Sequence, residues 1–283
     1  MTLSTNPLHP LFAAEVVGLD LSSPLPDAAS RALREALRTH RLLAFRDQFL
    51  GPAEQIAFTR ILGTPELHVV AGLRSPGQPE IVLEVGAADG RNGFGLGDLR
   101  WHADLSYTPR PNRLSALHAR ALPPAGGVTL FADQCAAFDR LDPWLAYRVQ
   151  FLEAEHDPAR RLPEDGAGAA PPPVAHPVVR VCPETGCRGL FVDEDTTTRL
   201  LGVPEPESGR LLRRLCAAAT DPTVTYRHAW RPGDLVVWDN HAVLHRAEPR
   251  EAGHGWRMHR TMVAASRHPY GPAAITQAWV VAG

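Results

Sequence analysis

Short apolar runs separated by turn-forming residues dominate the hydrophobic pattern of this 283-residue chain. Runs of this kind, bounded by Gly, Pro, Asn or Asp, are typical of β-strands. They predict strands within residues 14–21, 42–45, 80–85, 115–122, 128–131, 177–181, 189–192, 224–230, 235–238 and 255–265. Many short strands joined by turns favour a β-barrel or a jelly roll.

A different periodicity, with apolar residues three and four positions apart, predicts several helices. One helix is expected to open at Pro26-Asp27, with the side chain of Asp27 as its N-cap. Three more are predicted over residues 51–62, 138–151 and 208–219, and Asp142-Pro143 is a second candidate for the start of the middle one. We therefore expect a mainly β fold with added helices, in a single domain over residues 1–283.

Two segments lack the apolar residues that a packed core needs. Residues 86–97 contain five glycines, and residues 158–173 are rich in Ala, Gly and Pro. Segments of this composition bury little surface and stay mobile. Each is predicted to be a lid over a functional site.

Composition and charge exclude several classes of function. Hydrophobic residues make up 44% of the chain and charged residues 21%, as in an ordinary soluble globule. A net charge of −2 gives no electrostatic footprint for nucleic acid. The chain has no apolar run of membrane-spanning length and no secretion signal at its start, so a cytoplasmic location is expected.

His102 and Asp104 are the first candidate functional residues. In an extended segment, residues two apart point to the same side, so an imidazole and a carboxylate would face one metal ion. Two His and one carboxylate are typical of non-haem Fe(II) oxygenases. His241 and His245 are both candidates for the third ligand. His245 is favoured because its neighbours are apolar, whereas His241 lies in a polar turn.

Arg260 is a second candidate. It shares a strand face with Trp256, Met258 and Met262, and a buried guanidinium needs an anionic partner. Its planar fork of donors matches a carboxylate, so a dicarboxylate co-substrate would satisfy it. The alternative is an internal Asp or Glu partner, because buried Arg pairs are common.

Several motifs then occur together in the chain. They lie at residues 14–21, 42–48, 101–104 (W-H-x-D), 126–130 (G-G-x-T-L), 176–180, 190–192 and 238–240 (W-D-N). In this order and over nearly the whole chain, they resemble the TauD/TfdA family of Fe(II)/2-oxoglutarate dioxygenases, the taurine dioxygenase-like enzymes.

The resemblance implies a double-stranded β-helix core, which is a jelly roll of the cupin kind. It also implies that His102, Asp104 and His245 bind Fe(II). Arg260 would then bind the distal carboxylate of 2-oxoglutarate, with the hydroxyl of Thr129 beside it. The implied reaction uses O2, converts 2-oxoglutarate to succinate and CO2, and oxidises a C–H bond of a small organic substrate by hydroxylation or desaturation.

The chain departs from the taurine-type pattern around the substrate. Val70 stands where those enzymes carry a substrate-binding His, and Thr196 and Pro158 stand where they carry pocket aromatics. His68, Arg100 and Thr196 are the predicted substrate contacts here. We therefore expect a substrate other than taurine, either derived from an amino acid or a specialised metabolite.

Two other classes stay open at this stage. Two His and a carboxylate also suit zinc, so a zinc-dependent hydrolase is one alternative. A non-catalytic metal-binding barrel is the other. The carboxylate of Asp104 argues against a halogenating relative, which carries a small residue at that position. The expected partner is a small molecule, with no nucleic acid and no membrane, and the chain is expected to form a homo-oligomer.

Overall fold

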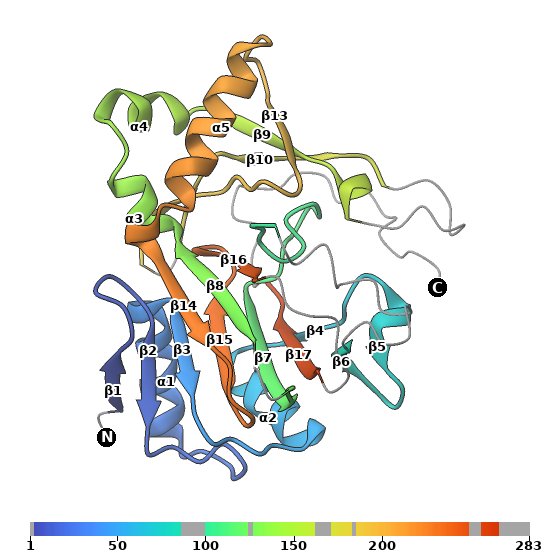
Figure 1. Cartoon of the computed structure of the whole chain (residues 1–283). Helices are drawn as coiled ribbons and strands as arrows, with labels where there is room; N and C mark the ends of the chain where they lie inside the picture. Colours follow the sequence, from blue (N-terminus) through green and yellow to red (C-terminus); the bar gives the residue numbers. More distant parts are fainter. Residues whose placement is uncertain are drawn as a thin grey trace.

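Two β-sheets that face each other form the centre of the molecule (Figure 1). The computed structural model describes residues 3–85, 100–123, 127–161, 171–182, 185–248 and 256–265. The strands of the larger sheet are β1 (Ser4–Pro7), β2 (Ala14–Val17), β3 (Leu42–Phe45), β4 (Pro65–Glu66), β5 (Arg74–Ser75), β6 (Gln78–Val85), β7 (Leu114–Ala121), β15 (Leu235–Asp239) and β17 (Arg257–Val263). Those of the smaller sheet are β8 (Val128–Asp133), β14 (Thr225–Ala229) and β16 (Val243–Ala247).

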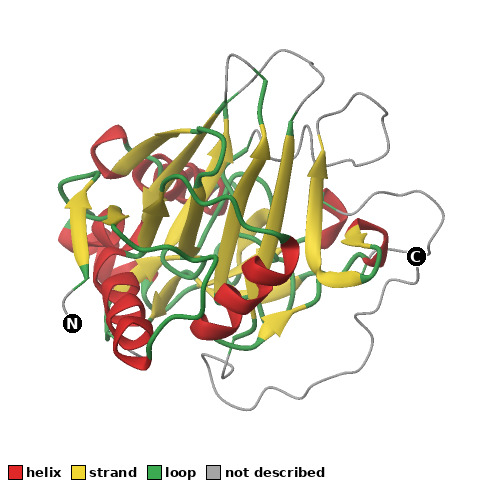
Figure 2. Ribbon diagram, turned by 90° about the horizontal axis from the view of Figure 1, so that it is seen from below, coloured by secondary structure: helices red, strands yellow, loops and turns green. Residues whose placement is uncertain are grey.

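The order of strands in the larger sheet is β1-β2-β3-β15-β7-β17-β6-β5, with β4 paired to β17. The smaller sheet has the order β14-β8-β16. Figure 2 shows the strands side by side in the middle of the molecule, with helices around them. Apart from β2 with β3, the strand pairs are antiparallel.

The central strand β15 is apolar on both faces because both are covered. Leu235 and Val237 pack with helices α1 (Asp27–His40) and α2 (Pro52–Leu62) on the outer face. Val236 and Trp238 pack against the smaller sheet in the interior. This explains why the strand reads as a continuous apolar run rather than as an alternating one.

The beginning of α1 differs from the prediction. Pro26 is the N-cap residue, Asp27 is the first helical residue, and no side chain caps the helix by a hydrogen bond. The predicted N-cap role of Asp27 is therefore wrong, although a carboxylate in the first turn still interacts favourably with the helix dipole. Helix α2 ends as predicted, with Gly63 after it. A Cβ at Gly63 would lie 2.5 Å from Cγ1 of Val263, so this packing requires glycine.

A second group of elements lies beyond one end of the sheets (Figure 1). It contains α3 (Gln134–Asp139), α4 (Pro143–Val149), α5 (Glu207–Ala219), β9 (Glu153–His156), β10 (Val174–Pro177), β13 (Thr197–Leu200) and the hairpin of β11 (Val179–Val181) with β12 (Arg188–Leu190). The helix predicted over 138–151 is thus two helices. Asp142 caps α4 by accepting a hydrogen bond from the amide of Leu145 at 3.2 Å, and Pro143 follows it.

Three short 3-10 turns, η1 (Ala71–Leu73), η3 (Pro158–Arg160) and η4 (Pro222–Val224), complete the described elements. The predicted lid over 86–97 lies outside the described residues, as do residues 162–170 of the second predicted lid. Within the described ranges, no helix combines the length and apolar character that a membrane span requires.

Candidate metal centre

Two segments far apart in sequence meet at β16 of the smaller sheet, where His102 lies opposite His245. His102 and His245 form an isolated antiparallel bridge, in which each backbone amide donates to the other residue's carbonyl, at 3.1 and 2.9 Å. Such a doubly bonded pair holds two residues directly opposite each other. Their imidazole centroids are 4.2 Å apart.

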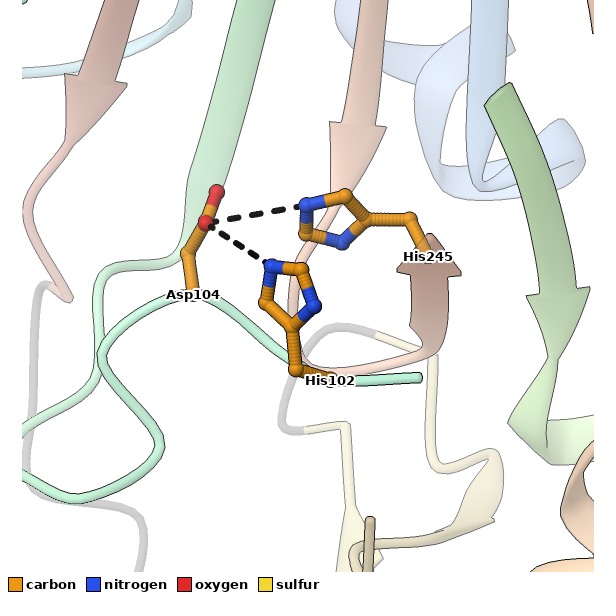
Figure 3. A group of neighbouring side chains, drawn as sticks. All are labelled: His102, Asp104 and His245. Carbon is orange, nitrogen blue, oxygen red and sulfur yellow. Dashed lines mark ion pairs between the residues drawn. The ribbon is translucent and has the colours of Figure 1, made fainter. Parts of the chain in front are cut away.

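Asp104 completes a compact group with these two histidines (Figure 3). Its Oδ1 lies 3.6 Å from Nε2 of His245 and 3.9 Å from Nε2 of His102. Ligands about 2.1 Å from one ion are roughly 3.0–3.4 Å apart at angles near 90–110°. The three side chains are therefore within a small adjustment of a facial metal site, and all three are buried.

The three groups have the protonation states that a divalent cation needs. Burial lowers the pKa of His245 to about 3, although Asp104 opposes this, and burial also holds the pKa of His102 well below its usual value. Burial would raise the pKa of Asp104, but the positive charge of Arg260 outweighs burial and holds this pKa below its usual value, so the carboxyl stays ionised. Neutral imidazole and ionised carboxylate are the forms that bind metal.

The surroundings orient both imidazoles. Nδ1 of His102 lies 2.8 Å from the carbonyl oxygen of Arg100, which can only accept, so Nδ1 carries the proton and Nε2 faces Asp104. The ring of His245 packs against two aromatic rings that also contact each other, with centroid distances of 4.8 Å to Trp238 and 6.2 Å to Phe131. Nε2 of His245 makes no hydrogen bond within the described residues.

His241, the other candidate for the third ligand, lies apart from this group. Its Nε2 lies 3.3 Å from the carbonyl oxygen of Pro111, and its backbone amide donates to Asp239 at 3.0 Å. The structure therefore brings His245, and not His241, to His102 and Asp104.

Arg260 and Thr129 have different neighbours. Nη1 of Arg260 donates to Oδ1 of Asp104, which places the guanidinium beside the metal-binding group. Oγ1 of Thr129 accepts a hydrogen bond from Nε1 of Trp230 at 2.8 Å. Trp256 of the same strand face as Arg260 packs on the chain next to Thr129, where a Cβ on Gly127 would lie 2.5 Å from its ring. Convergence of Arg260 and Thr129 on one carboxylate stays a prediction.

The three predicted substrate contacts lie in different settings. His68 is buried, and its pKa falls to about 4 because of burial and the charge of Arg260, so it lies within electrostatic reach of the site. Its Nδ1 accepts a hydrogen bond from the amide of Val70 at 3.1 Å. The Arg100 residue is exposed.

Thr196 is buried within a polar network. Its hydroxyl lies 2.8 Å from the hydroxyl of Ser106, 2.9 Å from Oδ2 of Asp193 and 3.1 Å from Nδ1 of His156. Thr196 therefore ties the segment after His102 to the second group of elements, and its role toward a substrate stays a prediction.

Three polar residues at the site were not predicted from the sequence. Ser115, Asn112 and Asn240 are buried and hydrogen-bonded to Asp104 or to one another. One signal was available, because a serine stood at an inward position of an apolar strand. Its partners Asp104 and Asn112 lie only 11 and 3 residues away, whereas Asn240 lies 136 residues from Asp104, a separation that no local pattern spans.

Comparison with known proteins places this geometry in a family. The family model described as "Taurine catabolism dioxygenase TauD, TfdA family" matches residues 4–262. The chain belongs to this family. The membership confirms the predicted dioxygenase class and the predicted mainly β, jelly-roll fold.

Relatives of this TauD/TfdA protein carry different names. It is 36% identical to the (S)-phenoxypropionate/alpha-ketoglutarate-dioxygenase of Sphingobium herbicidovorans, covering 86% of this chain and 88% of that protein. Pentalenolactone F synthase of Streptomyces avermitilis is 31% identical, covering 83% of this chain and 85% of that protein. The crystal structure of AAD-2 with Mn(II) and N-oxalylglycine superposes with a TM-score of 0.84 at 29% identity, covering 95% of this chain and all of that one.

Proposed function

We propose that this protein is an Fe(II)- and 2-oxoglutarate-dependent oxygenase, formed by a single domain. It couples decarboxylation of 2-oxoglutarate to succinate with oxidation of a C–H bond in a small organic substrate. The observation that carries the proposal is the buried group of His102, Asp104 and His245, with the basic side chain of Arg260 against it. Alpha-ketoglutarate, which is 2-oxoglutarate, appears in the name of the phenoxypropionate relative.

The residues present fit a divalent iron ion. Two neutral imidazoles and one ionised carboxylate form the facial ligand set of non-haem Fe(II) oxygenases, and Nε2 of His245 has no competing hydrogen bond within the described residues. When bound, the ion would supply the oxidative chemistry with O2 and leave coordination positions open for the co-substrate. The protein holds these three ligands in place and keeps the site dry.

The co-substrate has two proposed anchors. Arg260 offers a planar fork of donors to a carboxylate, and it lies within reach of the metal ligands. Thr129 offers a hydroxyl on β8, two residues along the same strand from Phe131, which stacks on His245. An anionic ligand would compete with Asp104 for the guanidinium of Arg260, so the partner of Arg260 would depend on which ligand occupies the site.

The primary substrate is proposed to be small and either derived from an amino acid or a specialised metabolite. The relatives are named for compounds as different as a phenoxypropionate and pentalenolactone F, so family membership alone does not fix the substrate. His68, Arg100 and Thr196 are the proposed substrate contacts. His68 has the firmest support, because it is buried and lies in the field of Arg260 and Asp104.

The test measures succinate formation from 2-oxoglutarate while a metabolite collection is screened for substrates. Wild-type protein with Fe(II) should form succinate, and His102→Ala and Asp104→Ala should lose this activity at least about 10²-fold. The matched controls are His40→Ala and Asp20→Ala, which remove the same groups away from the site. Near-native turnover by His102→Ala or Asp104→Ala would contradict the iron assignment.

The same protein can be tested for the zinc-hydrolase alternative. Anaerobic addition of Fe(II) and 2-oxoglutarate should produce a weak visible charge-transfer band in an oxygenase and none in a hydrolase. A cytoplasmic location and a homo-oligomeric state are also proposed, and sedimentation of the purified protein would test the second.

A further inference from the structure

A chain of side-chain hydrogen bonds ends on the metal-binding carboxylate. Oγ of Ser115 donates to Oδ2 of Asp104 at 2.5 Å, and Nδ2 of Asn112 donates to Oγ of Ser115 at 2.9 Å. Nδ2 of Asn240 in turn lies 3.2 Å from Oδ1 of Asn112. All four residues are buried, so each bond forms in a medium that water does not screen.

The direction of these bonds follows from which atoms can donate. Nδ2 of Asn112 also donates to the carbonyl oxygen of Leu114 at 2.9 Å, and a flipped amide would set two oxygens against each other there. Asn112 must therefore donate to Ser115. The hydroxyl proton of Ser115 is left for Asp104, whose ionised carboxylate can only accept.

Asn240 also fixes the backbone of Asp104. Its Oδ1 accepts from the Asp104 amide at 2.8 Å, and its Nδ2 donates to the Asp104 carbonyl oxygen at 2.7 Å. Backbone and side chain of the metal-binding residue are thus held by one connected set of amides and one hydroxyl. The set is placed by the larger sheet, in which Ser115 of β7 pairs with Trp238 of β15.

The two oxygens of Asp104 consequently have different tasks. Oδ1 faces the imidazoles of His102 and His245 and also accepts a hydrogen bond from Nη1 of Arg260. Oδ2 accepts the short charge-assisted bond from Ser115. Turning the carboxylate so that both oxygens face the histidines would break the Ser115 bond.

We propose that Ser115, supported by Asn112, is a positioning residue that makes Asp104 bind the metal through one oxygen only. A carboxylate that uses one coordination position leaves the remaining positions open for the co-substrate and O2. This inference rests on the proposed metal site and deepens it. Ser115 is not one of the three candidate ligands, and it acts through Asp104.

The experiment uses Co(II) as the probe in the full-length chain, read by its visible absorption spectrum and by competition with a chelator. Ser115→Ala should bind Co(II) about 10- to 100-fold more weakly than the wild type and with a changed spectrum. Ser115→Thr keeps the hydroxyl and should restore both. Ser208→Ala is the matched control, because it removes a buried hydroxyl that bonds only to the amide of Leu200 at 2.9 Å among the described contacts.

Ser115→Ala with the affinity and spectrum of the wild type would overturn the proposal. If that variant does not fold, Asn112→Ala replaces it, because it leaves the Ser115 hydroxyl without the donor that orients it. A spectrum of Asn112→Ala identical to that of the wild type would equally overturn the role of the chain. Wild-type protein that binds no Co(II) would reject the metal site itself, and this result is separate from any effect of the variants.

Discussion

Replacing Arg260 with glutamine removes the cation that accompanies Asp104. The side chains of the two residues are only 7% and 6% exposed, so the pair is shielded from solvent. Breaking a buried pair leaves the other charge uncompensated, which costs about 3–5 kcal/mol. We expect a loss of this size in the free energy of unfolding of the metal-free protein.

A divalent cation bound to Asp104 should restore part of the lost stability, because it replaces the positive charge of Arg260 beside this carboxylate. The assay is urea unfolding in the presence of a chelator, repeated with saturating Mn(II). Binding at about 100 times the dissociation constant stabilises a folded protein by about 2.7 kcal/mol. The metal should therefore stabilise Arg260→Gln at least as much as it stabilises the wild type.

The matched control is Arg227→Gln, which breaks the ion pair of Arg227 with Glu248. Those side chains are 57% and 34% exposed, and such a pair contributes about 0–1 kcal/mol. If Arg260→Gln lowers the free energy of unfolding no more than Arg227→Gln does, the reasoning about the buried pair is refuted.

Arg260→Gln should also raise the KM for 2-oxoglutarate. A rise confined to the KM of the primary substrate would remove Arg260 from the co-substrate role.

Two further predictions concern stability. Burial raises the pKa of Glu66 from 4.5 to about 7, so the folded state holds a proton that the unfolded state releases. The stability of the wild type should therefore fall as pH rises from about 4.5 through 7. At pH 8, Glu66→Gln should be more stable than the wild type by up to about 3 kcal/mol. The control Glu153→Gln should show no such gain in stability at pH 8. Gly127→Ala should lose about 1–3 kcal/mol in urea unfolding, because its Cβ would lie 2.5 Å from the ring of Trp256, whereas Gly72→Ala has open space. A stability difference between Glu66→Gln and the wild type that does not change with pH would contradict the first account. Equal stability of Gly127→Ala and Gly72→Ala would contradict the second.

Most strands of the two sheets could be predicted because burial on one or both faces leaves a pattern in the sequence. Strand β15 shows this, since its apolar run reflects cover on both faces. Strand β16 was missed, because Val243–Ala247 includes a His and an Arg and follows directly on a turn. The start of α4 at Asp142-Pro143 was visible as a capping signal, whereas the separate helix α3 before it was hidden by the continuous amphipathic pattern.

The metal centre was predictable in part for a similar reason. The spacing of His102 and Asp104 is local, so the sequence indicated it directly. The choice of His245 depends on a backbone bridge across more than a hundred residues, and the apolar setting of that residue was only an indirect sign of it. Asn240 bonds to Asp104 across 136 residues, which no local pattern encodes. The bond of Ser115 to Asp104 spans only 11 residues, but Ser115 by itself reads as an ordinary strand residue.

The central claim is that His102, Asp104 and His245 hold iron next to 2-oxoglutarate. The most direct measurement is an anaerobic titration of Fe(II) into the protein with 2-oxoglutarate, read by the visible charge-transfer band, for the wild type, His245→Ala and His241→Ala. The wild type and His241→Ala should develop the band, and His245→Ala should not. A band that survives in His245→Ala and disappears in His241→Ala would contradict the site described by the structure.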